Sequence, residues 1–431
     1  MTFAIRSTRV ITPSGVGPAA VHVTDGSISA ITAWDDLAGV SLVHEAADLI
    51  IMPGLIDSHV HVNEPGRAEW EGFASATHAA AAGGITTICD MPLNSIPATT
   101  TVAALDAKRA AARGQCVVGV EFIGGVVPGN TDQLAALAQA GVCAFKCFLS
   151  PSGVDEFHHV TEADLRLAFP VLRELGLPLM VHAEDPALLQ VATPGPSSQR
   201  YANYLATRPV GAEHSAIALM IRLMEWCPTP VHIVHLSSAT SLDPVREAKG
   251  RGLPLTVETC PHYLTFAAEE IPDGATEYKC APPIRGAAER DALWTALLAG
   301  NIDLVASDHS PCPPAMKGID GDFFSAWGGI ASLQLSLAAV WTGAKARGAS
   351  PALISKWMSA GPARLVGRGD RKGAIVAGYD ADLVVWDPEA TFVVDATSLL
   401  HRHPLTPYAG RTLSGVVRAT FVGGKVAHGR V

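Results

Sequence analysis

The segment Leu55-Ile-Asp-Ser-His-Val-His-Val62 has the composition of a buried strand that also carries chemically active side chains. Apolar, β-branched runs of this kind form strands that are covered on both faces of a sheet. His59 and His61 are two positions apart, so on a strand both imidazoles point to the same side. Similar runs recur along the middle of the chain, each followed by an Ala/Leu-rich stretch of helical length. The predicted strands are Leu55–Val62, Thr86–Met91, Val117–Ile123, Cys143–Leu149, Leu179–Glu184, Val231–Leu236, Leu255–Thr259 and Leu304–Asp308.

This alternation of strands and helices predicts a parallel sheet. Eight strand–helix units over about 250 residues match the arithmetic of a closed parallel barrel. An open doubly wound sheet is the alternative, but no Gly-x-Gly-x-x-Gly motif opens a predicted helix. We therefore predict an α/β fold with a (β/α)8 barrel of the TIM type.

The two ends of the chain differ from its middle. Asp25-Gly26 near the start and Gly423-Gly424 near the end both lie between short apolar runs, which is typical of β-hairpin turns. We predict a small β-sandwich domain built from both chain termini. The predicted boundaries assign residues 1–52 and 365–431 to this domain and residues 53–364 to the barrel.

The overall composition excludes several classes of protein. The 431 residues are 48% hydrophobic and 17% charged, which is too apolar for a disordered chain. Lys and Arg number 31 against 41 Asp and Glu, and no basic cluster occurs, so we expect no nucleic-acid partner. No apolar run approaches the roughly 20 residues of a membrane helix, and the first residues lack a signal-peptide core. Eight cysteines without a Cys-x-x-Cys pair predict reduced, mostly buried thiols, and we expect a cytoplasmic protein without a membrane partner.

Polar residues late in the predicted strands are the candidate site, because active sites of such barrels lie at the carboxyl ends of the strands. A His-x-His pair is a weak metal signal by itself, and a single strand histidine is more often a core residue. Their combination at the ends of one barrel favours a functional site. The six candidates are His59, His61, Lys146, His182, His235 and Asp308.

Lys146 is the most informative candidate because its neighbours in Ala144-Phe-Lys-Cys-Phe148 are apolar. Lysine is almost never fully buried without a partner, so a buried ion pair or an amine that reaches the rim would be the ordinary explanation. Burial also lowers the pKa of an amine. A neutral amine reacts with carbon dioxide to form a carbamate, and this N6-carboxylysine can bridge two metal ions. The set then predicts His59, His61 and Asp308 on one divalent ion, His182 and His235 on a second, and carboxylated Lys146 between them.

Several motifs resemble the amidohydrolase superfamily, and within it the cyclic amidohydrolases, which comprise dihydroorotases, hydantoinases and allantoinases. Met52-Pro-Gly-Leu-Ile-Asp-Ser-His-Val-His61 and the stretch from Lys372 to Leu383 carry this resemblance, which covers nearly the whole chain. The similarity to allantoinases is strongest in residues 63–73, 91–94, 141–148, 307–317 and 326–330. The resemblance implies two divalent ions per subunit, expected to be Zn²⁺, carbon dioxide as the lysine carbamate, and a homotetramer.

The resemblance also implies an activity, the hydrolysis of the hydantoin-ring amide of allantoin to allantoate in purine catabolism. A hydroxide activated by two metal ions would attack, and Asp308 would transfer the proton. Dihydroorotases carry an arginine two residues after the second histidine, whereas Asn63 occupies that place here, which favours a small neutral cyclic ureide. A hydantoinase or dihydropyrimidinase is the first alternative, followed by a dihydroorotase. A catalytically inactive scaffold is the alternative from another class.

Contacts to the substrate are expected from loops that lie over the pocket in relatives. Each candidate also has an ordinary structural explanation: Arg67 could pair with Glu69 or Glu71, Asn94 could bond its own turn, and Trp327 could pack within its loop. The residues expected to contact substrate are Asn63, Arg67, Asn94, Ser310, Trp327 and Gly328.

Overall fold

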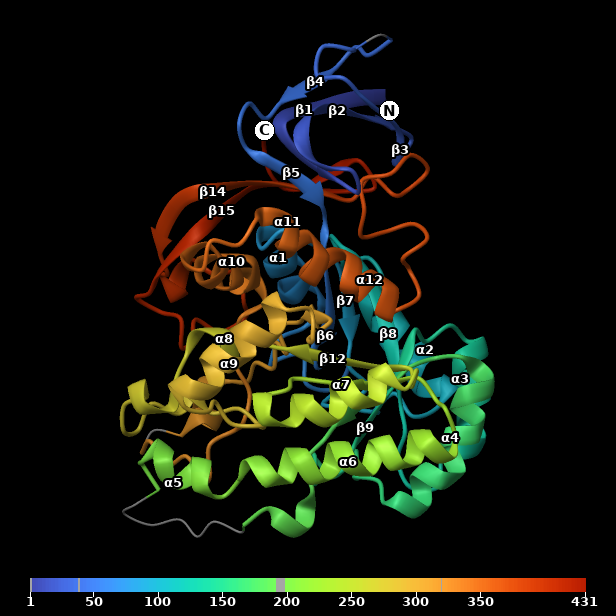
Figure 1. Ribbon diagram of the computed structural model, residues 1–431, viewed down its shortest axis with the longest axis vertical. Coiled ribbons are helices and arrows are strands. Elements are labelled where there is room, and N and C mark those ends of the chain that lie inside the picture. Colours follow the sequence, from blue (N-terminus) through green and yellow to red (C-terminus); the bar gives the residue numbers. More distant parts are fainter. Residues whose placement is uncertain (1, 38, 191–197, 319) are drawn as a thin grey trace.

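The computed structural model describes residues 2–37, 39–190, 198–318 and 320–431. It contains a sheet built from both ends of the chain and a parallel barrel below it (Figure 1). The terminal sheet consists of β1 (Thr2–Thr12), β2 (Gly15–Thr24), β3 (Ser27–Thr32), β4 (Val43–Glu45), β5 (Ile50–Pro53), β14 (Leu383–Val393), β15 (Thr412–Val422) and β16 (Lys425–Gly429). Its strands follow the order β16-β15-β14-β5-β1-β2-β3, and β4 pairs with β1.

The terminal sheet curls over its own core. Phe3 of β1 stacks on Phe421 of β15 with the ring centroids 5.9 Å apart, although β5 and β14 separate these two strands within the sheet. Asp25 and Gly26 have φ angles of 49° and 86°, so the first predicted hairpin turn has the two positive φ angles that Gly and Asp tolerate best. The predicted β-rich domain from both termini is confirmed, and it is one continuous sheet. Its exact boundaries stay a prediction.

The second sheet is the predicted parallel barrel, and all eight predicted strands are present. They are β6 (Leu55–Val60), β7 (Ile85–Asp90), β8 (Gly119–Gly125), β9 (Ala144–Phe148), β10 (Leu179–His182), β11 (Val231–Ile233), β12 (Leu255–Thr259) and β13 (Leu304–Val305). Each strand pairs in parallel with its neighbour in the chain.

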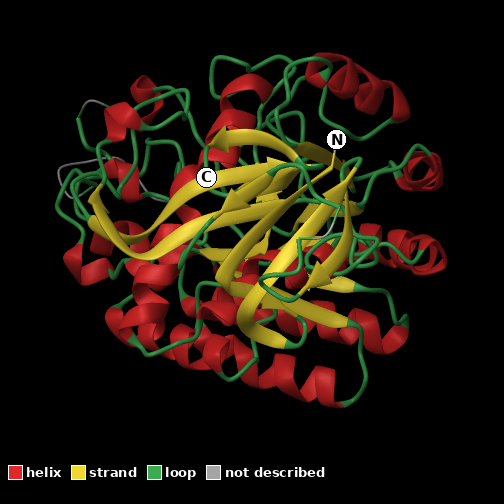
Figure 2. Cartoon of the chain, turned by 90° about the horizontal axis from the view of Figure 1, so that it is seen from above, coloured by secondary structure: helices red, strands yellow, loops and turns green. Residues whose placement is uncertain are grey.

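Helices surround these strands in the view from above (Figure 2). They are α1 (Phe73–Ala82), α2 (Val102–Ala112), α3 (Leu134–Gln139), α4 (Glu162–Leu175), α5 (Tyr201–Ala206), α6 (Val210–Trp226), α7 (Leu242–Gly250), α8 (Pro261–Thr265), α9 (Ala287–Leu298), α10 (Ser336–Ala346), α11 (Pro351–Ser355) and α12 (Gly361–Leu365). Among the described residues, none of the helices combines the length and the apolar character needed to cross a membrane.

The barrel closes between β6 and the segment that follows β13. Val60 and His309 form an isolated parallel bridge, and the His61 N–H donates to the His309 carbonyl oxygen at 2.8 Å. The buried Asp57 carboxylate accepts the backbone N–H of Ser307 at 3.2 Å. These contacts join the first strand to the last and complete the predicted barrel.

Strands β10, β11 and β13 end earlier than the apolar runs predict, each at or just before a candidate site residue. The β10 ladder ends at His182, and β11 and β13 end two or three residues before His235 and Asp308. His235 and Asp308 have φ angles of 40° and 47°, so the backbone leaves the extended conformation there. The apolar run predicted the strand, but the turn of the backbone at the site ends its pairing.

Gly54 joins the terminal sheet to the barrel and offers a test of this packing. A Cβ atom at Gly54 would lie 2.3 Å from Thr86 Cγ2. We expect Gly54→Ala to lower the free energy of unfolding by about 1–3 kcal/mol, because overpacking forces neighbours apart. Urea unfolding measures this change. Gly250→Ala, where no atom lies within 4 Å of the added Cβ, is the control, and an equal loss in both variants would contradict the packing argument.

Candidate metal centre

A cavity of about 800 Å³ opens at the carboxyl ends of the barrel strands. Its wall includes every one of the six polar residues that the strand ends predicted. The structure therefore brings together His59, His61, Lys146, His182, His235 and Asp308.

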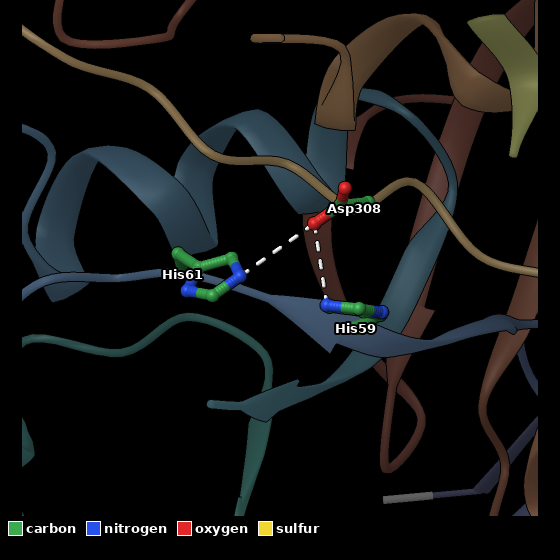
Figure 3. A group of neighbouring side chains, drawn as sticks. All are labelled: His59, His61 and Asp308. Atoms are coloured by element: carbon green, nitrogen blue, oxygen red, sulfur yellow. Dashed lines mark ion pairs between the residues drawn. The ribbon is translucent and has the colours of Figure 1, made fainter. Parts of the chain in front are cut away.

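The first group joins the first barrel strand to the last. The Asp308 Oδ1 atom lies 3.2 Å from His59 Nε2 and 3.5 Å from His61 Nε2 (Figure 3). Burial alone would raise the pKa of Asp308, but the imidazoles of His59 and His61 lower it to about 2. The group thus offers two nitrogen ligands and one charged oxygen ligand, a set that suits a divalent ion such as zinc.

The second group consists of His182 and His235 on neighbouring strands. Their facing atoms, Nδ1 of His182 and Nε2 of His235, lie 3.0 Å apart. Burial lowers the pKa of both imidazoles, which favours the neutral form that binds metals. The Nδ1 atom of His235 is buried and has no partner among the described residues. Two facing neutral imidazoles form a second potential ligand pair.

Lys146 lies on β9 and lines the same cavity, together with Phe148 of that strand. Its Nζ atom lies 4.8 Å from the centroid of the Phe148 ring. The side chain is fully buried, and Nζ has no hydrogen-bond partner among the described residues. Burial lowers the pKa of this amine to about 8. Neither a buried ion pair nor an amine that reaches the rim describes this lysine.

The six residues offer donor atoms that suit divalent metal ions. A buried polar atom without a partner is costly, and both the Lys146 amine and the His235 imidazole contain one. Bound ions and a carboxyl group on the amine would satisfy atoms that the protein itself leaves unpaired.

The residues expected to contact substrate divide into two sets. Asn94, Ser310, Trp327 and Gly328 line the cavity, whereas Asn63 and Arg67 are outside the lining. The Nδ2 atom of Asn94 lies 3.4 Å from Nδ1 of His61.

Arg67 and Asn63 lie behind the cavity wall. Arg67 donates to the Asn94 carbonyl oxygen at 2.8 Å and pairs with Glu156, rather than with either nearby glutamate of its own loop. Asn63 is fully buried, and its Nδ2 atom lies 3.5 Å from the Pro311 carbonyl oxygen. The structure therefore shows Arg67 holding the backbone of a cavity residue.

Comparison with known proteins agrees with this geometry. The amidohydrolase family model matches residues 50–427. The chain belongs to the amidohydrolase family. It is 51% identical to an allantoinase from Streptomyces avermitilis, covering 98% of this chain and 94% of that protein, and 44% identical to an allantoinase from Arabidopsis thaliana, covering 99% and 88%. Among solved structures, an L-hydantoinase (dihydropyrimidinase) from Arthrobacter aurescens is similar with a TM-score of 0.92 and 29% identity, covering 99% of this chain and 96% of that one.

This amidohydrolase also contains a buried carboxylate behind its first histidine that the sequence reasoning missed. Glu258 Oε1 lies 2.7 Å from His59 Nδ1, and Glu258 Oε2 lies 2.9 Å from His232 Nε2. Burial opposes its charge, but these imidazoles lower the pKa of Glu258 well below its usual range. A carboxylate that hydrogen-bonds to the ring nitrogen not used for the metal orients a metal-binding histidine and fixes its tautomer. Glu258 is itself a polar residue late in a predicted strand, so the criterion that selected the other candidates also identifies it.

Glu184 has the same relation to the second group. Its Oε2 atom lies 2.8 Å from His182 Nε2 and 3.2 Å from the Arg208 guanidinium. Each histidine group of this amidohydrolase thus has one member that is held from behind by a buried carboxylate.

Glu258 provides a test of this arrangement. We expect Glu258→Ala to weaken the binding of a divalent ion at His59 and His61 by about 10–100-fold, because an unsupported imidazole loses its orientation. Competition with a fluorescent chelator measures this affinity. Glu121→Ala is the matched control, since Glu121 also lies on a barrel strand but pairs with Arg368. Equal metal affinity in the Glu258 variant and the unmodified protein would show that the carboxylate does not orient His59.

Proposed function

We propose that this amidohydrolase is an allantoinase that hydrolyses the cyclic amide bond of allantoin to give allantoate. Near-full-length similarity to allantoinases, at 51% identity over 98% of the chain, is the observation that carries this function. The hydantoinases and dihydropyrimidinases represent a related family with the same fold, at 29% and 28% identity in two solved structures. A scaffold without catalysis does not fit a chain that retains all six candidate ligands.

A divalent metal centre belongs to this function, and zinc is the proposed metal because histidine and carboxylate ligands suit it. His59, His61 and Asp308 would hold one ion, and His182 and His235 the other. When bound, the two ions lower the pKa of water and polarise the amide carbonyl. We further propose that the protein is a cytoplasmic homotetramer whose partner is a small cyclic ureide.

Lys146, carboxylated on its amine, would help to hold both ions. A bond forms between Nζ and the carbon of carbon dioxide, one proton leaves the amine, and the product carries a single negative charge. The buried, unpartnered amine supports this step because its pKa of about 8 leaves about a tenth of the amine neutral at pH 7, far more than for an exposed lysine.

The protein's own residues would handle the proton and the substrate. Asp308 is charged and faces the cavity, so it can take a proton from the attacking water and deliver it to the leaving ring nitrogen. Asn94, Ser310 and Gly328 line the same cavity and supply amide, hydroxyl and backbone groups for the N–H and C=O groups of a ureide. Trp327 adds an aromatic side chain to the cavity wall. Arg67 would act indirectly, by holding Asn94.

Metal content tests the two-ion proposal. We expect close to two zinc ions per chain, loss of activity with chelators and recovery on adding zinc. His59→Ala and Asp308→Ala should each lose metal and activity, whereas His78→Ala, on the exposed side of α1, should lose neither. Elemental analysis of the active protein measures the stoichiometry. Full activity with less than one ion per chain would contradict a mechanism that uses two ions.

Lys146 tests the carbamate. We expect Lys146→Ala to lose at least about 100-fold in kcat, because the bridging carboxylate disappears. Acetate or propionate at high concentration should restore part of the activity by occupying the space of the carbamate. Lys249→Ala, which removes a surface ion pair with Asp303, is the control. Intact-mass measurement that finds a free amine in fully active enzyme would exclude the carbamate.

A substrate panel of allantoin, hydantoin, dihydrouracil and dihydroorotate tests specificity. We expect allantoin to give the highest kcat/KM, because a site built for hydrogen bonds rejects rings that leave those groups unpaired. Dihydroorotate should be essentially unused, since its carboxylate would be buried without compensation. Comparable turnover of dihydroorotate and allantoin would overturn the assignment.

A further inference from the structure

A second group of metal-binding side chains lies against Asp308. Cys260, His262 and Asp308 each place one possible ligand atom within 4.8 Å of the others, and all three are buried. Cys260 directly follows β12, and His262 lies in the short helix α8. Asp308 lines the cavity whereas Cys260 and His262 do not, so this group lies behind the cavity wall. It shares one residue with the centre described above and is otherwise separate from it.

The imidazole of His262 lacks the hydrogen-bond partners that a buried ring normally has. The side chain is fully buried, yet neither ring nitrogen has a hydrogen-bond partner among the described residues. The adjacent Tyr263 cannot supply one, because its hydroxyl donates to the Pro282 carbonyl oxygen at 2.7 Å and its ring packs edge-on against the imidazole. An unsatisfied buried donor or acceptor costs about 1–3 kcal/mol. A species other than the described side chains would remove this cost.

The three ligand atoms define the chemical class of that species. A cysteine sulfur, an imidazole nitrogen and a carboxylate oxygen together favour a soft or borderline divalent cation over Mg²⁺ or Ca²⁺. We propose that Cys260, His262 and Asp308 form a third cation site, which takes Zn²⁺ in excess or Cd²⁺. When the metal–sulfur bond forms, the thiol proton leaves to solvent, and the ion reaches the site past Asp308.

Asp308 belongs to both ligand groups, so a cation bound at the third site affects the catalytic centre. The carboxylate is the proposed proton carrier, and a cation bound on its far side would hold its charge and its orientation. Occupation of the third site should therefore inhibit the enzyme. The inhibition rests on the proposed function, whereas binding of the cation does not.

Cadmium titration of the zinc-loaded enzyme tests both parts separately. Binding is followed by the ultraviolet charge-transfer band of a cadmium–thiolate bond, which the five nitrogen and oxygen ligands and the lysine of the binuclear centre cannot produce. We expect one further equivalent of Cd²⁺ per chain to develop this band. Activity on allantoin should fall in parallel, by about 100-fold at saturation if Asp308 stops transferring protons.

Two variants identify the ligands. Cys260→Ser should keep the basal activity, lose the band and need at least about tenfold more Cd²⁺ for inhibition, as expected when one metal ligand is lost. His262→Gln should keep the thiol and yet bind Cd²⁺ more weakly, which provides a second reading if the cysteine variant does not fold. Cys143→Ser and Cys116→Ser are the controls, because Cys143 is another buried thiol, beside Cys89, and Cys116 is the least buried of the eight free cysteines.

The outcomes are distinct. A band that persists in Cys260→Ser, or that disappears in a control instead, overturns the site. Absence of any further Cd²⁺ binding also overturns it and indicates that a buried water satisfies His262. A band that depends on Cys260 without loss of activity keeps the site and excludes the inhibition. If the protein does not act on allantoin at all, the band still decides whether the site exists.

Discussion

The candidate centre depends on the hydrogen bonds that join β6 to the segment after β13. Asp57 is fundamental here, because its buried carboxylate accepts N–H groups from His59, two residues along its own strand, and from Ser307, at the opposite end of the barrel sequence. Burial raises the pKa of Asp57 to about 6, so the protein keeps this acid in the barrel wall at a cost to its charged form. This carboxylate holds the two ends of the barrel together. His59 and Asp308, which are 249 residues apart in the chain, therefore lie within 3.2 Å of each other. Without closure, the first ligand group would have no carboxylate.

The backbone has an unusual conformation at several residues that follow barrel strands. Four residues after barrel strands, Asn63, Asn94, His235 and Asp308, have φ angles of 68°, 64°, 40° and 47°. Such conformations are unfavourable for residues with a Cβ atom, by about 1–3 kcal/mol each, and they persist only where the surroundings impose them. Three of these residues, Asn94, His235 and Asp308, line the cavity, so the turn of the backbone lies at its wall. Asparagine and aspartate tolerate this conformation better than β-branched residues do, which explains part of the residue choice at these positions.

Local pattern predicted the strands and the six ligand candidates because each depends on a short segment. An apolar run identifies a buried strand, and a histidine or lysine late in that run is unusual enough to be noticed. The same criterion also identifies Glu258, but it does not predict which distant residues meet, since Glu258 contacts His59 across 199 residues and Arg67 contacts Glu156 across 89. The structural alternative for Arg67, a pairing with Glu69 or Glu71 of its own loop, likewise missed its actual partner, Glu156. The closure of the barrel determines which distant polar residues meet. The sequence of one short segment does not contain that information.

Charge inside the cavity supports a neutral ring as the substrate. Arg67 was the residue that could have served as a clamp for a charged group, but it lies outside the lining and is already paired. Apart from Lys146, two cationic side chains line the described wall, Arg208 and Lys279. Arg208 lies 3.2 Å from the buried Glu184 carboxylate. Lys279 donates to two backbone carbonyl oxygens, one of them at 3.2 Å. Once Lys146 carries the proposed carboxyl group, a substrate carboxylate would leave water without an unpaired cationic side chain among the described wall residues to receive it, which is expensive. A neutral ureide requires only hydrogen-bond partners such as Asn94. The ion pairs that order the cavity wall thereby also remove the positive charge that an anionic ring would need.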